Sequence, residues 1–128
     1  MKFGCQIITY GDIKRTIEYA VAAEKAGFSI ISLPDHLFHP LMREFLSKPP
    51  WDTYIMLGAI ACRTNRAKLM SGVTDPLRRH PATIAHAFST LDILSNGRAI
   101  LGIGAGAVSY THLRAHETSL HLVCRLLL

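Results

Sequence analysis

The residues of this sequence that could do chemistry stand at the ends of apolar runs. Asp35 and His36 follow the run FSIISL, Gly72–Asp75 stands at the end of a later run, and Gly104–Gly106 ends the last one. Histidine titrates near neutral pH, so His36 is suited to giving or taking a proton. Taken alone, such a histidine is more often a satisfied structural residue, and the glycines are equally consistent with simple turns.

Charge and cysteine content exclude several classes of protein. The formal net charge is +5, but the basic residues are scattered, and the densest group, Arg78–His80, suits a small anionic ligand or a solvated loop better than a nucleic acid. The cysteines form no C-x-x-C pair, which argues against a disulfide framework or a thiolate metal site. We expect all three to be small buried residues: Cys5, Cys62 and Cys124.

Length and composition indicate one compact domain. The chain has 128 residues, of which 49% are hydrophobic and 18% are charged. No apolar run approaches the roughly 18 residues of a membrane span, and the opening MKFGCQIITYGD lacks the features of a signal peptide. These features predict a cytoplasmic protein.

Strand patterns and helix patterns alternate along the chain. The expected strands are 2–9, 28–33, 67–73 and 98–103, and the expected helices are 13–26, 51–63 and 81–95, with a further short helix near 41–46. Asp12 and Pro81 are typical of helix starts, and Gly27 is typical of a helix end. The expected inward positions are Ile55, Ala59 and Cys62 in the second helix and Ile84, Phe88 and Leu91 in the third.

This alternation, with nearly continuous apolar strands, predicts a parallel sheet with helices outside. An open doubly wound sheet and a (β/α)8 barrel both fit. The glycine-rich turn does not follow the first strand, however, so it matches a dinucleotide-binding fingerprint poorly. In a barrel, the three polar strand ends would meet at one mouth. We therefore predict an α/β fold that is the N-terminal half of a TIM barrel, with about four βα units.

The chain from Met1 to about Gly106 resembles the luciferase-like superfamily of flavin and deazaflavin oxidoreductases, which are TIM barrels. The likeness lies in MKFG, AEKAGF, PDH and SGVTDPLRRHPATIAHAFSTLDILSNGRAILGIGAG and in the spacing between them. It is greatest to the branch that uses the deazaflavin coenzyme F-420 (F420), which includes methylenetetrahydromethanopterin reductase. The resemblance implies an oxidoreductase that transfers a hydride between F420 and a small organic substrate, and a parent protein that is a homodimer.

The resemblance implies roles for the strand ends. Gly72 and Val73 match the place of a non-prolyl cis peptide, which forms a bulge behind the deazaflavin ring. Asp35 and His36 match a pair near the ring and the substrate, where His36 would carry a proton. Thr74 is expected at the ring edge.

Two further features belong to the same expected site. Asp75 could also meet the ring edge, although an aspartate before a proline can equally shape a turn. The backbone amides of Gly104 and Gly106 are expected to approach the coenzyme or its phosphate.

One residue departs from the methanopterin reductases, and two other functions stay open. Those enzymes carry a glutamate near the end of the first strand, where this chain has Gln6, and an amide cannot act as an acid or base. The alternatives are an FMN-dependent monooxygenase of the same superfamily and a non-catalytic flavin-binding or interaction protein.

The sequence changes character after residues 1–107. Residues 108–128 resemble a translated sequencing adapter, so we expect a non-native tail behind the N-terminal part of a barrel. The tail holds His112, His116 and His121, whose spacing does not match H-E-x-x-H, and no metal site is expected. Four strands cannot close an eight-stranded barrel, so the chain is expected to be inactive alone and to associate through open edges.

Overall fold

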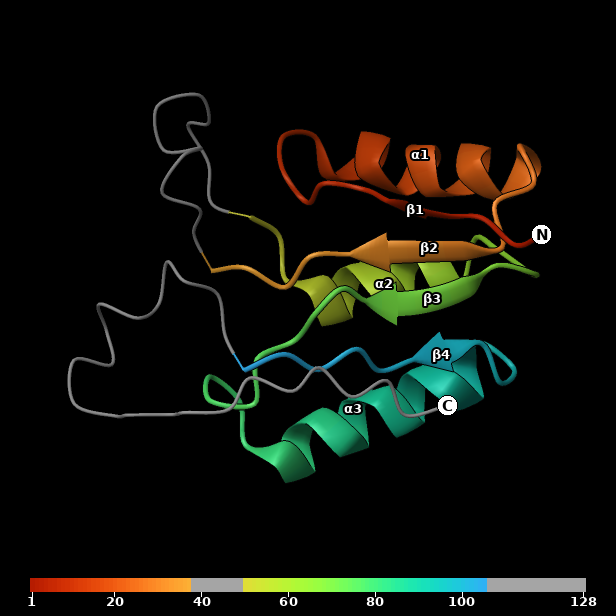
Figure 1. The fold of residues 1–128 in the computed structure, drawn as a ribbon. Helices are drawn as coiled ribbons and strands as arrows, with labels where there is room; N and C mark the ends of the chain where they lie inside the picture. The colour runs from red at the N-terminus through yellow and green to blue at the C-terminus, as the bar shows by residue number, and fades with distance from the viewer. Residues whose placement is uncertain (38–49, 106–128) are drawn as a thin grey trace.

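The computed structural model describes residues 1–37 and 50–105. In chain order the elements are β1 (Gly4–Gln6), α1 (Ile13–Lys25), β2 (Ile30–Leu33), α2 (Thr53–Ala61), β3 (Lys68–Ser71), α3 (Pro81–Leu94) and β4 (Ala99–Ile100). The strands form one parallel sheet in the order β1-β2-β3-β4 (Figure 1). The expected alternation is confirmed, and the short helix near 41–46 lies outside the described residues.

The observed strands are shorter than the apolar runs that predicted them. Among the described residues β1 pairs only with β2, at the three positions Gly4 to Gln6. The run continues beyond the ladder on both sides, and Ser29 N still donates to Phe3 O while Ile7 N donates to Ser32 O. An apolar run in the sequence includes every residue that faces the core, whereas a β-strand ends where no partner strand lies beside it to form backbone hydrogen bonds.

Local side-chain chemistry sets the helix ends as expected. The Asp12 carboxylate accepts from the backbone amide of Lys14 at 2.8 Å and so caps α1. Gly27, just beyond α1, has a φ of +94°, a conformation that glycine adopts without steric cost. Pro81 is the first residue of α3, and the chain leaves that helix through Asn96 and Gly97, both at positive φ.

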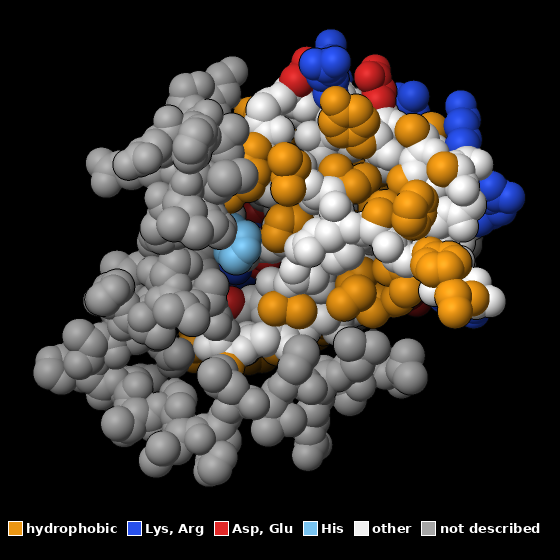
Figure 2. Space-filling view, turned by 45° about the horizontal axis from the view of Figure 1, so that its top comes forward, with side chains coloured by type: hydrophobic (Ala, Val, Ile, Leu, Met, Phe, Trp, Pro, Cys, Tyr) orange, Lys and Arg blue, Asp and Glu red, His pale blue; other side chains and the backbone are white. Residues whose placement is uncertain are grey.

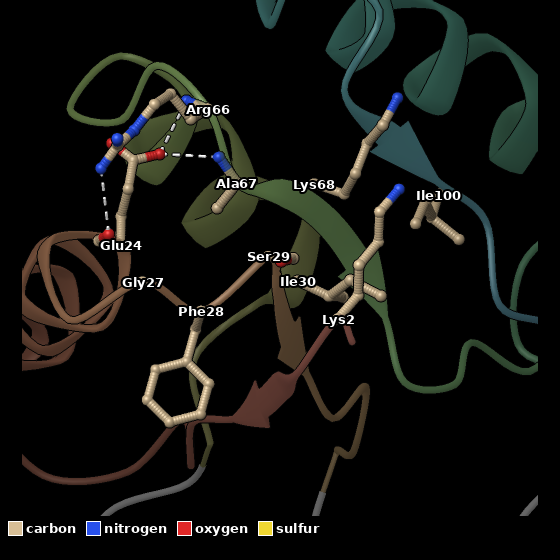
Figure 3. Close-up of a pocket in the computed structure, with 10 residues that line it drawn as sticks. All are labelled: Lys2, Glu24, Gly27, Phe28, Ser29, Ile30, Arg66, Ala67, Lys68 and Ile100. Atoms are coloured by element: carbon tan, nitrogen blue, oxygen red, sulfur yellow. Dashed lines mark hydrogen bonds between the residues drawn. The ribbon is translucent and has the colours of Figure 1, made fainter.

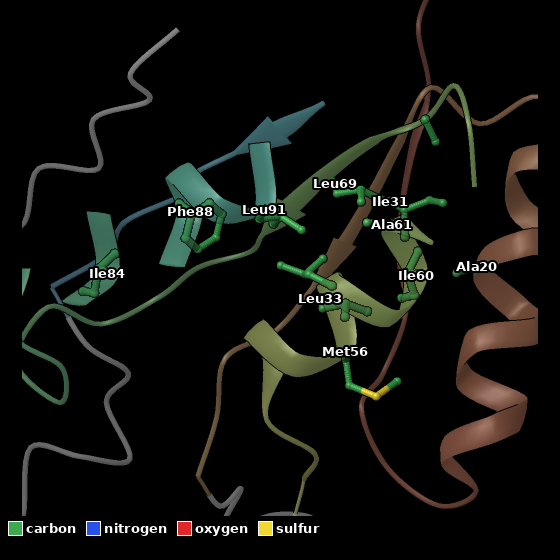
Figure 4. Close-up of a cluster of buried hydrophobic side chains, with 12 residues drawn as sticks. Ala20, Ile31, Leu33, Met56, Ile60, Ala61, Leu69, Ile84, Phe88 and Leu91 are labelled. Carbon is green, nitrogen blue, oxygen red and sulfur yellow. The ribbon is translucent and has the colours of Figure 1, made fainter. Parts of the chain in front are cut away.

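The hydrophobic core lies between the sheet and the three helices. Ile31 and Leu33 of β2 and Leu69 of β3 are fully buried, and α2 packs over them (Figure 4). α3 adds the three inward residues expected from its spacing, namely Ile84, Phe88 and Leu91, which are 2%, 6% and 6% exposed. This packing holds the carboxyl ends of the strands at a common edge.

The expected inward face of α2 is wrong in part. Ile55 is 72% exposed and Cys62 is exposed, whereas Ala59 is half-buried. The stripe that meets the sheet is Met56, Leu57, Ile60 and Ala61. Apolar residues occur on most sides of α2, so their spacing alone could not select the buried stripe.

The expectation of buried cysteines fails as well. Cys62 is exposed, while Cys5 of β1 is half-buried and packs against the core. Burial raises the pKa of the Cys5 thiol above its ordinary value, so this side chain stays a neutral thiol at physiological pH. Cys124 lies outside the described residues.

Helices cover only one face of the sheet within the described residues. On the other face Gln6, Ser32, Met70 and Ile100 stand in register across the four strands, and none of them is buried. Hydrophobic side chains reach the surface at several places in Figure 2. No helix within residues 1–37 and 50–105 is long and apolar enough to cross a membrane.

Candidate functional site

A bulge built on Gly72 and Val73 closes β3 at the carboxyl edge. The peptide bond between them is cis, as expected from the resemblance. Gln6 of β1 donates from Nε2 to the Gly72 carbonyl at 3.0 Å, and the Gly72 amide donates to Leu33 O at 2.8 Å. A Cβ atom on Gly72 would collide with the hydroxyl of Ser32, so any side chain here would force Ser32 to turn away. Gln6 therefore has a structural partner at the bulge.

The glycines after β4 make room for the bulge. A Cβ on Gly104 would collide with the side chain of Val73, and one on Gly102 would collide with the carbonyl of Ser71. The Gly104 amide donates to Thr74 O at 2.9 Å. That amide is therefore used within the protein, and the sequence-based expectation that it approaches the coenzyme or its phosphate is not supported for Gly104. Gly106 lies outside the described residues.

A buried carboxylate lies next to the bulge. Asp35, which follows β2, is 4% exposed, and its Oδ2 accepts from the Thr74 hydroxyl at 2.7 Å. The same oxygen is 3.0 Å from Nη2 of Arg78, which also donates to the backbone carbonyl of Asp35. A buried carboxylate needs this pairing, because an isolated charge in the interior is very costly.

Asp75 shapes the turn that brings Arg78 to this position. Its Oδ1 accepts from the backbone amide of Leu77 at 2.8 Å, the geometry of an aspartate-led turn. Its Oδ2 is 3.7 Å from Nε of Arg78. Of the two roles considered for Asp75, the structure therefore shows the turn-forming one.

The basic cluster Arg78–His80 has partners within the protein. Arg79 forms an ion pair with Asp52 at 2.5 Å, and Nδ1 of His80 accepts from the Ala82 amide at 3.2 Å at the start of α3. With Arg78 paired to Asp35, the three side chains serve three separate contacts. The cluster does not form the anion-binding group considered from the sequence.

Tyr54, in the first turn of α2, is a member of the site that sequence reasoning missed. Its hydroxyl lies 2.6 Å from Oγ1 of Thr74, and its ring meets Phe88 edge-on at 5.3 Å between centroids. The guanidinium of Arg79 lies over the ring, 4.2 Å from its centroid. Burial raises the pKa of Tyr54, and the charge of Asp35 adds to this rise, so the phenol remains protonated at neutral pH.

Asp52 joins the start of α2 to the same edge. Its Oδ1 accepts from the amides of Tyr54 and Ile55 at 2.9 and 3.1 Å, and its Oδ2 meets Arg79. Burial by itself would raise the pKa of Asp52, but the Arg79 hydrogen bond and the helix amides outweigh it and hold the pKa below its ordinary value. Asp52 is therefore ionised at neutral pH.

His36 directly follows Asp35 and is half-buried at the same edge. The structure thus brings Asp35, His36, Thr74 and the bulge to one end of the sheet, as the barrel interpretation predicted. Within the described residues, no group of three or more His, Cys, Asp or Glu side chains could hold a metal ion.

A cavity of about 540 Å³ opens at the opposite, amino end of the strands. Lys2, Lys68 and Ile100 are among its lining residues, and Glu24 stands at its edge (Figure 3). The Glu24 carboxylate accepts from the backbone amides of Asn65, Arg66 and Ala67. At this end of the sheet the Glu24 carboxylate therefore connects α1 to the loop before β3, whereas the Asp35 network lies at the other end.

The chain matches a known family. The sequence model of the luciferase-like monooxygenase family covers residues 1–115. The F420-dependent glucose-6-phosphate dehydrogenase of Amycolatopsis mediterranei is 43% identical over 91 residues, which are 70% of this chain and 26% of the relative. The 5,10-methylenetetrahydromethanopterin reductase of Methanolobus tindarius is 34% identical over 106 residues, which are 83% of this chain and 29% of the relative.

A solved structure supports the same relationship. The coenzyme F420 dependent tetrahydromethanopterin reductase of Methanopyrus kandleri superposes with a TM-score of 0.74 at 27% identity, over 88% of this chain and 30% of that chain. The predicted fold class, the N-terminal part of a TIM barrel, is confirmed. The chain spans 26% to 30% of the length of these three proteins.

Proposed function

Because this chain belongs to the luciferase-like monooxygenase family, we propose that the protein containing it is an oxidoreductase that transfers a hydride between the deazaflavin coenzyme F420 and a small organic substrate. F420 is named for both the Amycolatopsis relative and the Methanopyrus structure, so it is the shared feature that we carry to this chain. The observation that carries the proposal is the buried network of Asp35, Thr74 and Arg78, which lies beside the Gly72–Val73 bulge at the carboxyl edge of the sheet.

The bulge suits a planar ring. Val73 is 38% exposed, and its neighbours Gly102 and Gly104 have no side chains that could rise beside it. Gln6 and the ladder around Gly72 hold the backbone from behind. An apolar side chain on a rigid backbone, flanked by glycines, is a suitable support for one face of a deazaflavin.

In this proposal each residue has a distinct role. When bound, F420 supplies the hydride chemistry. His36 gives or takes the proton that accompanies the hydride, since imidazole exchanges protons near neutral pH. Asp35, with its charge balanced by Arg78, forms the polar side of the site next to His36. Thr74, expected at the ring edge, is fully buried, and its hydroxyl holds the Asp35 carboxylate instead. Gln6 supports the bulge and takes no part in proton transfer.

Titration of the full-length gene product with F420 and, separately, with FMN tests the proposal. We expect F420 to bind and its absorbance to change when a small organic hydride donor is added, only in the presence of the protein, while FMN binds weakly. Tight FMN binding without F420 binding would instead support the FMN-dependent monooxygenase. A bound flavin without turnover would support the non-catalytic flavin-binding protein. The small-molecule substrate, the homodimer and the cytoplasmic location remain predictions.

A further inference from the structure

Two short hydrogen bonds join Tyr54, Thr74 and Asp35 into a chain. The Tyr54 hydroxyl lies 2.6 Å from Oγ1 of Thr74, and that hydroxyl donates to Oδ2 of Asp35 at 2.7 Å. Thr74 is 0% exposed and Asp35 is 4% exposed, so water competes little for these bonds.

The direction of the chain follows from proton counting. A threonine hydroxyl has one proton, and Thr74 gives it to the carboxylate of Asp35. Oγ1 of Thr74 must then accept from Tyr54, whose phenol keeps its proton in this environment. The phenol therefore donates to the hydroxyl, and the hydroxyl donates to the carboxylate.

Two side chains contact the ring of Tyr54. The rings of Tyr54 and Phe88 meet edge to face, with an angle of 86° between their planes, and the guanidinium of Arg79 lies over the Tyr54 ring. Arg79 is in turn paired with Asp52, the residue that caps α2. The phenol oxygen is consequently fixed relative to the start of α2, which packs on the core.

We propose that Tyr54 is a positioning residue that, through the hydroxyl of Thr74, fixes the carboxylate of Asp35 beside the coenzyme site. Arg78 forms an ion pair with Oδ2 of this carboxylate, and the Thr74 hydroxyl donates a hydrogen bond to the same oxygen. The Tyr54 hydroxyl orients Thr74 and therefore orients this hydrogen bond. This role of Tyr54 rests on the proposed function in one respect, namely that the Asp35 carboxylate lies next to bound F420. The chain of hydrogen bonds itself can be tested without any coenzyme.

The experiment is a double-mutant cycle on the full-length protein with Tyr54→Phe, Thr74→Val and the double variant. Tyr54→Phe keeps the ring and its contacts with Arg79 and Phe88 and removes only the hydroxyl. Tyr19→Phe is the matched control, because Tyr19 is a tyrosine of α1 that is 56% exposed. Thr74→Ser is the conservative variant that retains a hydroxyl.

The first readout is the side-chain carboxyl ¹³C resonance of Asp35 in coenzyme-free protein, assigned by its loss in Asp35→Asn. We expect this resonance to move in Tyr54→Phe and in Thr74→Val, and to stay in place in Tyr19→Phe and near its original place in Thr74→Ser. Adding Tyr54→Phe to Thr74→Val should move it no further, because the connection is already broken.

The second readout is the hydride-transfer rate at saturating F420. We expect Tyr54→Phe to slow it about five-fold, the size of one buried hydrogen bond, with no further loss in the Thr74→Val background. An unmoved Asp35 resonance in Tyr54→Phe, or equal shifts in both backgrounds, overturns the positioning role. Failure of the unmodified protein to bind F420 refutes the proposed function, while the coenzyme-free resonances still decide whether Tyr54 positions Asp35.

Discussion

At the scale of single residues, two adjacent arginines have entirely different partners. Arg78 turns inward to the buried Asp35, whereas Arg79 pairs with Asp52 and lies over the ring of Tyr54. Both arginines lie in the turn before α3, where successive side chains project in different directions, so neighbours in sequence need not be neighbours in space. A basic pair in a sequence is therefore weak evidence for one anion site.

Replacing His36 tests the proton-transfer role directly. We expect His36→Ala to lower the rate of hydride transfer about 100-fold or more, the usual contribution of a general acid or base, with little change in F420 affinity. His86→Ala is the control, since His86 is an exposed residue of α3. Steady-state kinetics with a separate F420 titration measure both quantities, and an unchanged rate in His36→Ala would remove this residue from the mechanism.

Glu24 makes the stability of the protein depend on pH. Burial alone would raise its pKa, but the amides of Ala67, Asn65 and Arg66 outweigh this and lower the pKa below 4.5. The stabilisation is therefore fully present above pH 4.5 and is lost as the pH falls through the lowered pKa of the folded state.

We accordingly expect Glu24→Gln to lower the unfolding midpoint at pH 7, and the difference from the unmodified protein to shrink as the pH falls below 4.5. Glu18→Gln, on the exposed side of α1, should show no such dependence. Thermal unfolding at a series of pH values measures the effect. A difference that stays constant with pH would mean that the Glu24 charge has no part in it.

At the scale of elements, one buried arginine joins the end of α2 to the turn before β4. Arg98 is 8% exposed and donates to the carbonyls of Ala61, Thr64, Ala67 and Ser95 at distances of 2.7 to 3.0 Å. These carbonyls have the negative ends of their dipoles toward the guanidinium, which therefore needs no carboxylate partner.

Arg98→Met should destabilise the fold strongly, because several buried carbonyls would lose their donor at about 1–3 kcal/mol each. We expect a total loss of at least about 3 kcal/mol, and Arg98→Lys should restore only part of it, since an ammonium cannot reproduce the planar donor geometry. Arg63→Met, at an exposed arginine after α2, is the control. Denaturant unfolding gives the values, and equal stability of Arg98→Met and Arg63→Met would contradict this role.

At the scale of the whole molecule, the sheet has one face that the described helices leave uncovered. Ile30, Met70 and Ile100 stand on this face and are only half-buried. Within the described residues, β1 and β4 each pair with one strand only. Apolar surface beside unpaired strand edges favours association.

We expect the purified 128-residue chain to self-associate or to precipitate as its concentration rises. Sedimentation velocity over a concentration series measures this directly, and calorimetry reports whether unfolding is cooperative. Replacing Met70 and Ile100 with threonine should reduce association if the uncovered face causes it. A monodisperse monomer that unfolds cooperatively would show that this face does not associate.

Much of the fold follows from local chemistry that can be read along the chain. Asp12, Gly27 and Pro81 act on their nearest neighbours, so the ends of α1 and the start of α3 were predictable. The positions of the strand ends were predictable for the same reason. Since the strands are parallel, these ends had to share one edge.

The sequence by itself thus determined the order of elements, the parallel sheet and the edge at which Asp35, Thr74 and the glycine bulge meet. Only the tertiary structure decided which stripe of α2 is buried and which partners these polar residues take. Thr74 and Arg78 lie 39 and 43 positions from Asp35 in sequence, and Tyr54 lies 20 from Thr74. Such contacts depend on how whole elements pack, and no local pattern encodes them.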